Sequence, residues 1–65
     1  MSHNFKIADL RKKKGMTQEE LSERSGVSRA TICALENGRN KGVSISTLTK
    51  IAEALGVKTE KIFYP

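Results

Sequence analysis

The segment from Thr17 to Arg39 constrains the fold more than any other part of the chain, because it carries the signals of two short helices joined by a sharp turn. Thr17 and Glu20 fit a capping box, in which a hydroxyl and a carboxylate three residues later satisfy free amides at a helix start. Gly26 can adopt the positive φ that a sharp turn demands. Ser28 can then cap a second helix. The segment therefore predicts two helices hinged at Gly26.

The second of these helices has one apolar face and one short, open face. Ile32 and Leu35 form the apolar face at i, i+3 spacing. A helix whose outer face is small, polar or basic, held at a fixed angle by its neighbour, has the shape needed to enter a DNA major groove. The outer positions are Arg29, Ala30, Thr31, Cys33 and Ala34.

Apolar periodicity predicts helix along the whole chain, and no window alternates with period two as a strand would. We expect an all-α fold, a compact five-helix bundle in a single domain over residues 1–65, since this length leaves room for one small domain. Residues 37–42, rich in Asn and Gly, are expected to form a loop. The five helices are expected at about 5–14, 18–25 and 29–36, then from the residue after Ser44 or Ser46 until Gly56 stops the helix, and at about 59–63.

Composition bounds the partners and the compartment. The net charge of +5 and the pI near 9.7 suit a polyanionic partner such as nucleic acid, although basic charge can also serve solubility alone. A single Cys allows no internal disulfide and fits a reducing cytoplasm. The N-terminus has no long apolar run, so neither a signal peptide nor a membrane span is expected. We therefore expect a cytoplasmic protein without a membrane partner.

The sequence offers no set of residues for catalysis or metal binding. Cys33 and His3 are single residues of their kinds and cannot build a metal-ligand set, so no metal or cofactor is expected. Cys33 is interpreted as a small packing residue, although its place beside the outer face leaves a redox role open. Glu19, Glu20 and Glu23 would need a cleft to shift their pKa values for acid–base work, and a short exposed helix gives none. We therefore expect no enzyme activity.

Several motifs occur in the order typical of one family. They are Leu10-Arg11 before Gly15, Thr17-Gln-Glu-Glu-Leu21, Gly26-Val-Ser28, Ile32, Leu35-Glu-Asn-Gly-Arg39 and Leu48-x-x-Ile-Ala-x-x-Leu-Gly-Val57. From Ile7 to Phe63 the chain resembles Xre-like helix-turn-helix domains of the phage repressor and Cro type. This resemblance implies a lambda/434 repressor-like fold and binding to double-stranded DNA.

The resemblance also implies which residues touch DNA. The groove-facing positions are Arg29, Ala30, Thr31 and Ala34, and the phosphate-facing positions are Thr17, Gln18, Asn37, Arg39 and Lys41. Arg29 can meet guanine O6 and N7 with two parallel bonds. Family members that carry Gln at the positions of Ala30 and Ala34 can donate hydrogen bonds there, whereas Ala offers only a methyl group. Sequence discrimination would then rest on few residues and on DNA shape. Each polar residue could instead be an ordinary solvent-facing residue.

Two further expectations concern architecture. The resemblance implies that Arg11 and Glu36 form a largely buried ion pair between the first helix and the end of the third; otherwise both are exposed and unpaired. Ile62, Phe63 and Tyr64 follow one another at the C-terminal end, where one short helix cannot turn all three inward. We expect them to form a homodimer interface, at least on DNA; otherwise the last helix only caps the core.

The sequence therefore predicts a sequence-specific transcriptional regulator, a repressor that binds a palindromic operator as a dimer. A close alternative is the antitoxin or controller protein of a two-gene cassette, which would bring a protein partner such as a toxin. A second alternative is a protein-interaction module that has lost DNA binding, since Ala30 and Ala34 offer no hydrogen-bonding group to a base.

Overall fold

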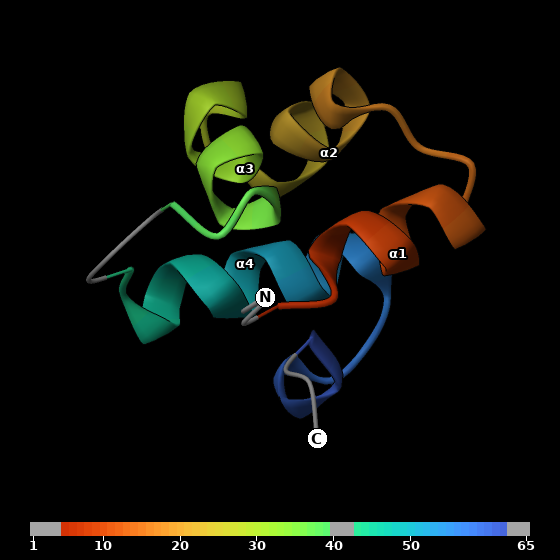
Figure 1. Ribbon diagram of the computed structural model, residues 1–65. Helices are drawn as coiled ribbons and strands as arrows, with labels where there is room; N and C mark the ends of the chain where they lie inside the picture. The colour runs from red at the N-terminus through yellow and green to blue at the C-terminus, as the bar shows by residue number, and fades with distance from the viewer. Residues whose placement is uncertain (1–4, 40–42, 63–65) are drawn as a thin grey trace.

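Four α-helices and one short 3-10 helix make up the part of the chain that the computed structural model describes, residues 5–39 and 43–62. No strand occurs within these residues. The all-helical prediction is therefore confirmed for the described chain. The elements are α1 (Ile7–Lys13), α2 (Gln18–Ser25), α3 (Arg29–Glu36), α4 (Ile45–Leu55) and the 3-10 helix η1 (Thr59–Ile62) (Figure 1).

Side-chain caps set where the helices begin. The Thr17 hydroxyl accepts the Glu20 amide at 3.0 Å, and the Glu20 carboxylate accepts the Thr17 amide at 2.9 Å, which confirms the predicted capping box of α2. Ser28 caps α3 by accepting the amide of the residue three positions later, at 3.2 Å. Ser44 caps α4 in the same way at 3.1 Å, so α4 begins after Ser44 and not after Ser46.

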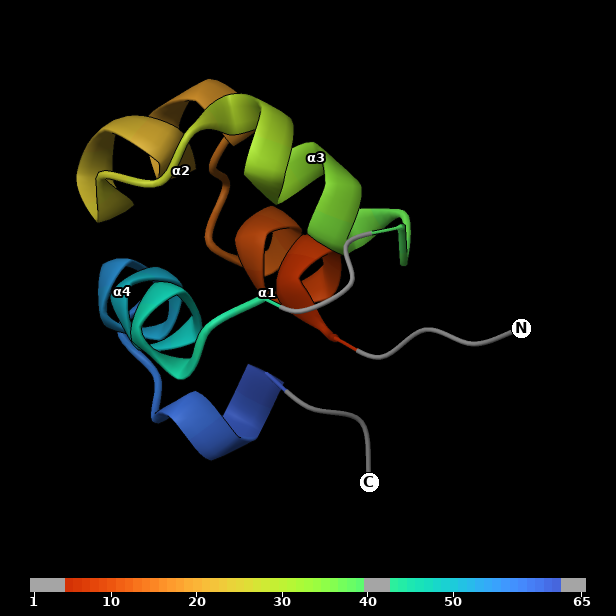
Figure 2. The same cartoon turned by 90° about the vertical axis from the view of Figure 1, so that its left-hand side faces the viewer.

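The helices enclose one apolar core. α2 packs against both α3 and α4, α1 packs against α3, and η1 packs against α4. Figures 1 and 2 show α1 and α4 as a middle layer, with α2 and α3 on one side and η1 on the other. Burying each Leu or Ile contributes about 1.5–3 kcal/mol relative to exposure. The buried apolar residues are Ile7, Leu21, Val27, Ile32, Leu35, Leu48, Ile51, Ala52, Leu55 and Ile62.

Both ends of the helical region differ from the prediction. α1 begins at Ile7 and not at Phe5, because the Lys6 carbonyl already accepts the first helical bond, from the Leu10 amide at 3.0 Å. The predicted fifth α-helix is a single 3-10 turn, so the five-helix count is not confirmed. The Ile62 carbonyl accepts the Lys6 amide at 2.6 Å, which ties this turn to the start of α1. Phe63, the predicted helix end, lies outside the described residues.

Within the described residues, no helix combines the length and the apolar character that crossing a membrane requires.

Candidate nucleic-acid interface

α3 presents one face to solvent and buries the other. Ile32 is fully buried and Leu35 is 1% exposed, while Arg29 and Ala30 are exposed. The angle of the helix is fixed by the turn before it. Gly26 has a φ of 75°, in the left-handed region that favours glycine. α3 therefore projects its outer face from a rigid support, and Thr31, Cys33 and Ala34 lie partly exposed on the same helix.

The cap of α3 also orients the hydroxyl of Thr31. The Ser28 hydroxyl donates to the Thr31 hydroxyl at 2.9 Å while it accepts the Thr31 amide at 3.2 Å. A hydroxyl has one proton to donate and two lone pairs to accept with. Thr31 therefore accepts in this pairing, and its own hydroxyl proton takes no part in the bond with Ser28. The sequence predicted that Thr31 faces the groove, but it did not predict the hydrogen bond between the hydroxyls of Ser28 and Thr31. That bond follows from the i, i+3 spacing between Thr31 and the cap residue.

A network centred on Glu36 joins three helices. Arg11 donates from Nε to Glu36 Oε2 at 2.7 Å and from Nη2 to Glu36 Oε1 at 3.1 Å. The side chains of Arg11 and Glu36 are only 12% and 7% exposed. Arg11 also donates from Nη1 to the Met16 carbonyl at 2.8 Å, so each of its three guanidinium nitrogens makes a hydrogen bond. The hydrogen bonds that Arg11 donates to Glu36, together with the negative charge of that carboxylate and against an opposing effect of burial, raise the pKa of Arg11 above its ordinary value.

The third member of the network is Gln18, the first residue of α2. Its Nε2 donates to Glu36 Oε1 at 3.0 Å. One N–H of the amide is thus committed to the protein, and the second N–H and the Oε1 atom have no bond within the described network. This contact was missed from the sequence because Gln18 and Glu36 are far apart along the chain. The phosphate contact expected of Gln18 stays a prediction, with one donor remaining for it.

The segment after α3 is held by backbone bonds. Gly38 has a φ of 68°, and the following amide, that of Arg39, donates back to the Ala34 carbonyl at 2.9 Å. Asn37 donates from Nδ2 to the Cys33 sulfur at 3.4 Å. Asn37 and Arg39 are both exposed at the end of α3. A polar amide and a cation, both open to solvent, therefore follow directly after α3.

Comparison with known proteins decides the family. The helix-turn-helix family profile matches residues 7–62. The chain belongs to the helix-turn-helix family of transcriptional regulators. It is 43% identical over 59 residues to an HTH-type transcriptional regulator of Sinorhizobium fredii, y4dJ, covering 91% of this chain and 75% of that protein. It is 54% identical over 50 residues to one of Methanothermobacter thermautotrophicus, covering 77% and 71%.

Solved structures agree with the family. The restriction-modification controller protein C.AhdI of Aeromonas hydrophila superposes with a TM-score of 0.81 at 32% identity, over 86% of this chain and 83% of that one. A chain of the SinR protein/SinI protein complex superposes with a TM-score of 0.79 at 31% identity, over 85% of this chain and 53% of that one. In this helix-turn-helix protein, α2, the turn at Gly26 and α3 are the elements that give the family its name.

The expected dimer interface needs a correction. Ile62 is fully buried in the core, where its side chain packs with α4, so it cannot form an exposed interface. The three consecutive apolar residues gave no signal for which of them turns inward. Phe63 and Tyr64 lie outside the described residues, as do Lys41 in the phosphate-facing set and His3 at the N-terminus.

The other candidate groups of this helix-turn-helix protein are possible metal ligands, one thiol and the carboxylates of α2. Within residues 5–39 and 43–62, no group of three His, Cys, Asp or Glu side chains could hold a metal ion. Cys33 is a free, partly exposed thiol. Glu19, Glu20 and Glu23 are exposed on α2, and Glu20 serves as a cap.

Proposed function

We propose that this chain is a transcriptional repressor that reads double-stranded DNA with α3. The observation that carries the proposal is the outer face of α3, which exposes Arg29 and Ala30 on a helix whose opposite face buries Ile32 and Leu35. A helix so mounted fits the major groove, where base edges differ between sequences. The protein would act in the cytoplasm, without a cofactor or an enzymatic step.

Residue roles divide between base edges and phosphates. Arg29 would meet guanine with its planar fork, and the Thr31 hydroxyl, which accepts from Ser28, would donate its proton to a base acceptor. Ala30 and Ala34 would offer methyl contacts to thymine. The phosphate contacts would come from Thr17, Gln18, Asn37, Arg39 and Lys41, which hold the protein in register on the duplex.

A homodimer on a palindromic operator completes the proposal. One helix of eight residues reads only a few base pairs, and a two-fold dimer doubles those contacts. Repression would be steric, since a dimer on its operator blocks polymerase. Phe63 and Tyr64 remain the sequence-based candidates for the dimer contact now that Ile62 is placed in the core.

A second candidate function is supported by one observation. C.AhdI and C.Esp1396I, which superpose on this chain, are restriction-modification controller proteins. This chain would then regulate a two-gene cassette and could meet a protein partner encoded beside it. The same DNA-reading surface serves both functions, so the candidates differ in the location of the operator and not in its chemistry.

Selection of bound sites from a random duplex pool tests the proposal. We expect a single enriched palindrome, and binding to random duplex that weakens steeply with salt, with a slope of about −0.9 for each phosphate neutralised. An enriched site upstream of the protein's own gene and a neighbouring gene would favour the controller function. A protein that binds no duplex at low salt would instead be an interaction module, and the proposal would fail.

A further inference from the structure

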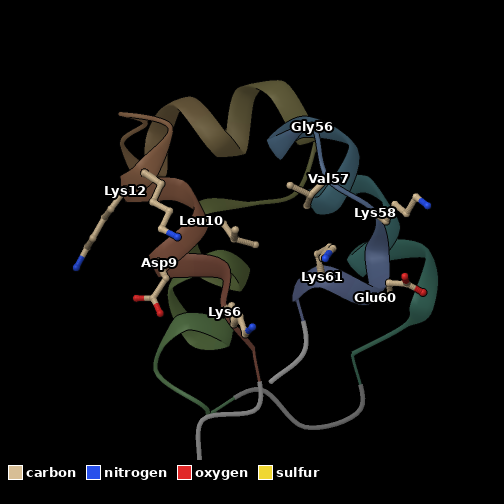
Figure 3. A pocket seen from close by; sticks show the side chains of 10 residues that line it. Lys6, Asp9, Leu10, Lys12, Gly56, Val57, Lys58, Glu60 and Lys61 are labelled. Carbon is tan, nitrogen blue, oxygen red and sulfur yellow. The ribbon is translucent and has the colours of Figure 1, made fainter. Parts of the chain in front are cut away.

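An open groove of about 930 Å³ separates α1 from the segment that runs from Gly56 to Lys61. Figure 3 shows Leu10 and Val57 projecting into this space from opposite walls. Both side chains are partly buried and pack against the core, so the groove has an apolar floor. The Val57 amide donates to the Ala52 carbonyl at 3.0 Å, which fixes that side of the floor to the end of α4.

The rim of the groove is basic. Five of the residues that line it are lysines and two are carboxylates, Asp9 and Glu60. The lysines come from both walls, so an occupant would meet positive charge on either side of the floor (Figure 3). Lys6 is partly buried. The other four lysines of the rim are exposed, and they are Lys12, Lys13, Lys58 and Lys61.

The groove lies away from the proposed DNA-reading helix. Figures 1 and 2 both place η1, which forms one wall, on the opposite side of the middle layer of α1 and α4 from α3. The floor residue Leu10 lies on α1, within that middle layer. An occupant of the groove would therefore leave the outer face of α3 open.

We propose that this groove binds an acidic amphipathic segment of a partner protein. An apolar side chain would cover Leu10 and Val57, and flanking carboxylates would meet the lysines of the rim. Charge complementarity selects this occupant, because exposed charges of opposite sign attract and steer association. A phosphate backbone would satisfy the lysines but leave the apolar floor uncovered. A second copy docked groove to groove would bring two basic rims together.

The probe is a synthetic peptide of about 14 residues, with Leu at helical i, i+3, i+4 and i+7 spacing and Glu elsewhere. Its binding is followed by amide chemical shifts of the ¹⁵N-labelled protein. We expect the largest shifts at Leu10, Val57 and Lys61. A second peptide, with each Leu replaced by Ser, keeps the carboxylates and should bind far more weakly.

Charge reversal on the two walls supplies the matched variants. Lys12→Glu combined with Lys58→Glu should weaken peptide binding roughly tenfold, since each reversal replaces an exposed attraction with a repulsion of similar size. Lys50→Glu is the control, because Lys50 is an exposed lysine of α4 that does not line the groove. It should leave peptide binding within about twofold. Equal melting temperatures would show that both variants fold.

Three results would overturn the inference. The first is equal binding by the Ser-substituted peptide, which would reduce the groove to a basic patch. The second is a set of shifts centred on Arg29 and Arg39, which would place the peptide on the DNA-reading surface. The third is a random duplex that perturbs Val57 and Lys61 as strongly as the peptide does, which would assign the groove to nucleic acid. The peptide experiment requires no DNA binding, so its outcome is independent of the proposed repressor function.

Discussion

The guanidinium of Arg11 meets both carboxylate oxygens of Glu36, from Nε at 2.7 Å and from Nη2 at 3.1 Å. This contact joins α1 to the last residue of α3. The same carboxylate accepts a bond from Gln18 at the start of α2. One buried carboxylate therefore fixes the relative positions of the first three helices, and with them the support of the proposed DNA-reading surface.

Removing that carboxylate should be costly. Glu36→Ala leaves the Arg11 side chain, which is 12% exposed, without its carboxylate partner. Breaking a buried pair in this way costs about 3–5 kcal/mol, a large share of the stability of a small domain. Urea denaturation followed by circular dichroism measures the loss of unfolding free energy.

The matched control for Glu36→Ala is Glu23→Ala, a truncation of an exposed glutamate of α2, which should change stability by less than about 0.5 kcal/mol. Arg11→Met combined with Glu36→Leu should recover much of the loss, because it removes both charges together. Equal and small effects of Glu36→Ala and Glu23→Ala would show that the pair contributes nothing to stability.

Substitution of Gly26, the hinge between α2 and α3, should lower the stability of the protein. Its φ of 75° lies in the left-handed region, and a Cβ built there would meet no atom within 4 Å. Gly26→Ala should therefore cost about 1–2 kcal/mol through backbone strain alone, measured by urea denaturation.

Asn tolerates the left-handed region better than Ala does, so Gly26→Asn should cost less than Gly26→Ala. The comparison separates strain from crowding, because Asn is the larger side chain. If Asn proved more destabilising than Ala, packing and not φ would control this turn.

Local signals account for what the sequence predicted well. The bounds of α2 and α3 follow from the Thr17 capping box, the Ser28 cap and the turn at Gly26, all of which act within a few residues. Prediction was weaker where the outcome depends on distant contacts. η1 is a single turn tied to Lys6, and Ile62 takes the core position among three similar neighbours. No local sequence pattern shows that η1 stops after one turn, or that Ile62 rather than its neighbours enters the core.

In the candidate site, too, features set by nearby residues were predictable and features set by distant contacts were not. The exposed face of α3 was predictable from the i, i+3 spacing of Ile32 and Leu35. The bond between Gln18 and Glu36 was not, because it depends on the packing of α2 against the end of α3. The Arg11–Glu36 pair was expected only through family resemblance, since nothing in the two side chains alone indicates burial.

Gln18 should contribute to stability and to DNA binding separately. Gln18→Ala removes the bond to Glu36, and a hydrogen bond to a charged group contributes about 1.5–3 kcal/mol, with the lower end expected at this partly exposed position. The loss should be smaller than for Glu36→Ala, because Arg11 remains paired. Loss of the proposed phosphate contact should weaken binding to random and selected duplex alike.

Fluorescence anisotropy at two salt concentrations measures that weakening. Glu19→Ala, which truncates the exposed neighbour on α2, is the control and should not reduce affinity. Duplex affinity unchanged by Gln18→Ala, alongside a measurable loss of stability, would restrict Gln18 to its structural role.

Arg29 and Arg39 should separate base reading from phosphate binding. Arg29→Ala should cost about 1–3 kcal/mol on the selected site and relax preference at one base pair in each half-site. Arg39→Ala should weaken all duplexes alike and reduce the salt slope by about one. Competition between selected and random duplex measures the difference. Equal weakening of both duplexes by Arg29→Ala would remove Arg29 from base recognition.

The proposed dimer makes a geometric prediction. Two α3 helices related by two-fold symmetry would lie about 34 Å apart, one turn of the duplex. Hydroxyl-radical footprinting on the selected site should therefore show two protected half-sites about 10 base pairs apart on one face. Tyr64→Ala should reduce the cooperativity of binding if the C-terminal aromatic residues form the contact.

Ile62→Ala provides the contrasting variant, because Ile62 is fully buried in the core. It should lower the unfolding free energy by about 2–5 kcal/mol, as truncation of a core Ile does, whether or not the protein dimerises. Tyr64→Ala should leave that free energy of the isolated chain nearly unchanged, so stability and cooperativity respond to different residues. A single protected half-site, together with full cooperativity in Tyr64→Ala, would exclude both the symmetric dimer and its C-terminal contact.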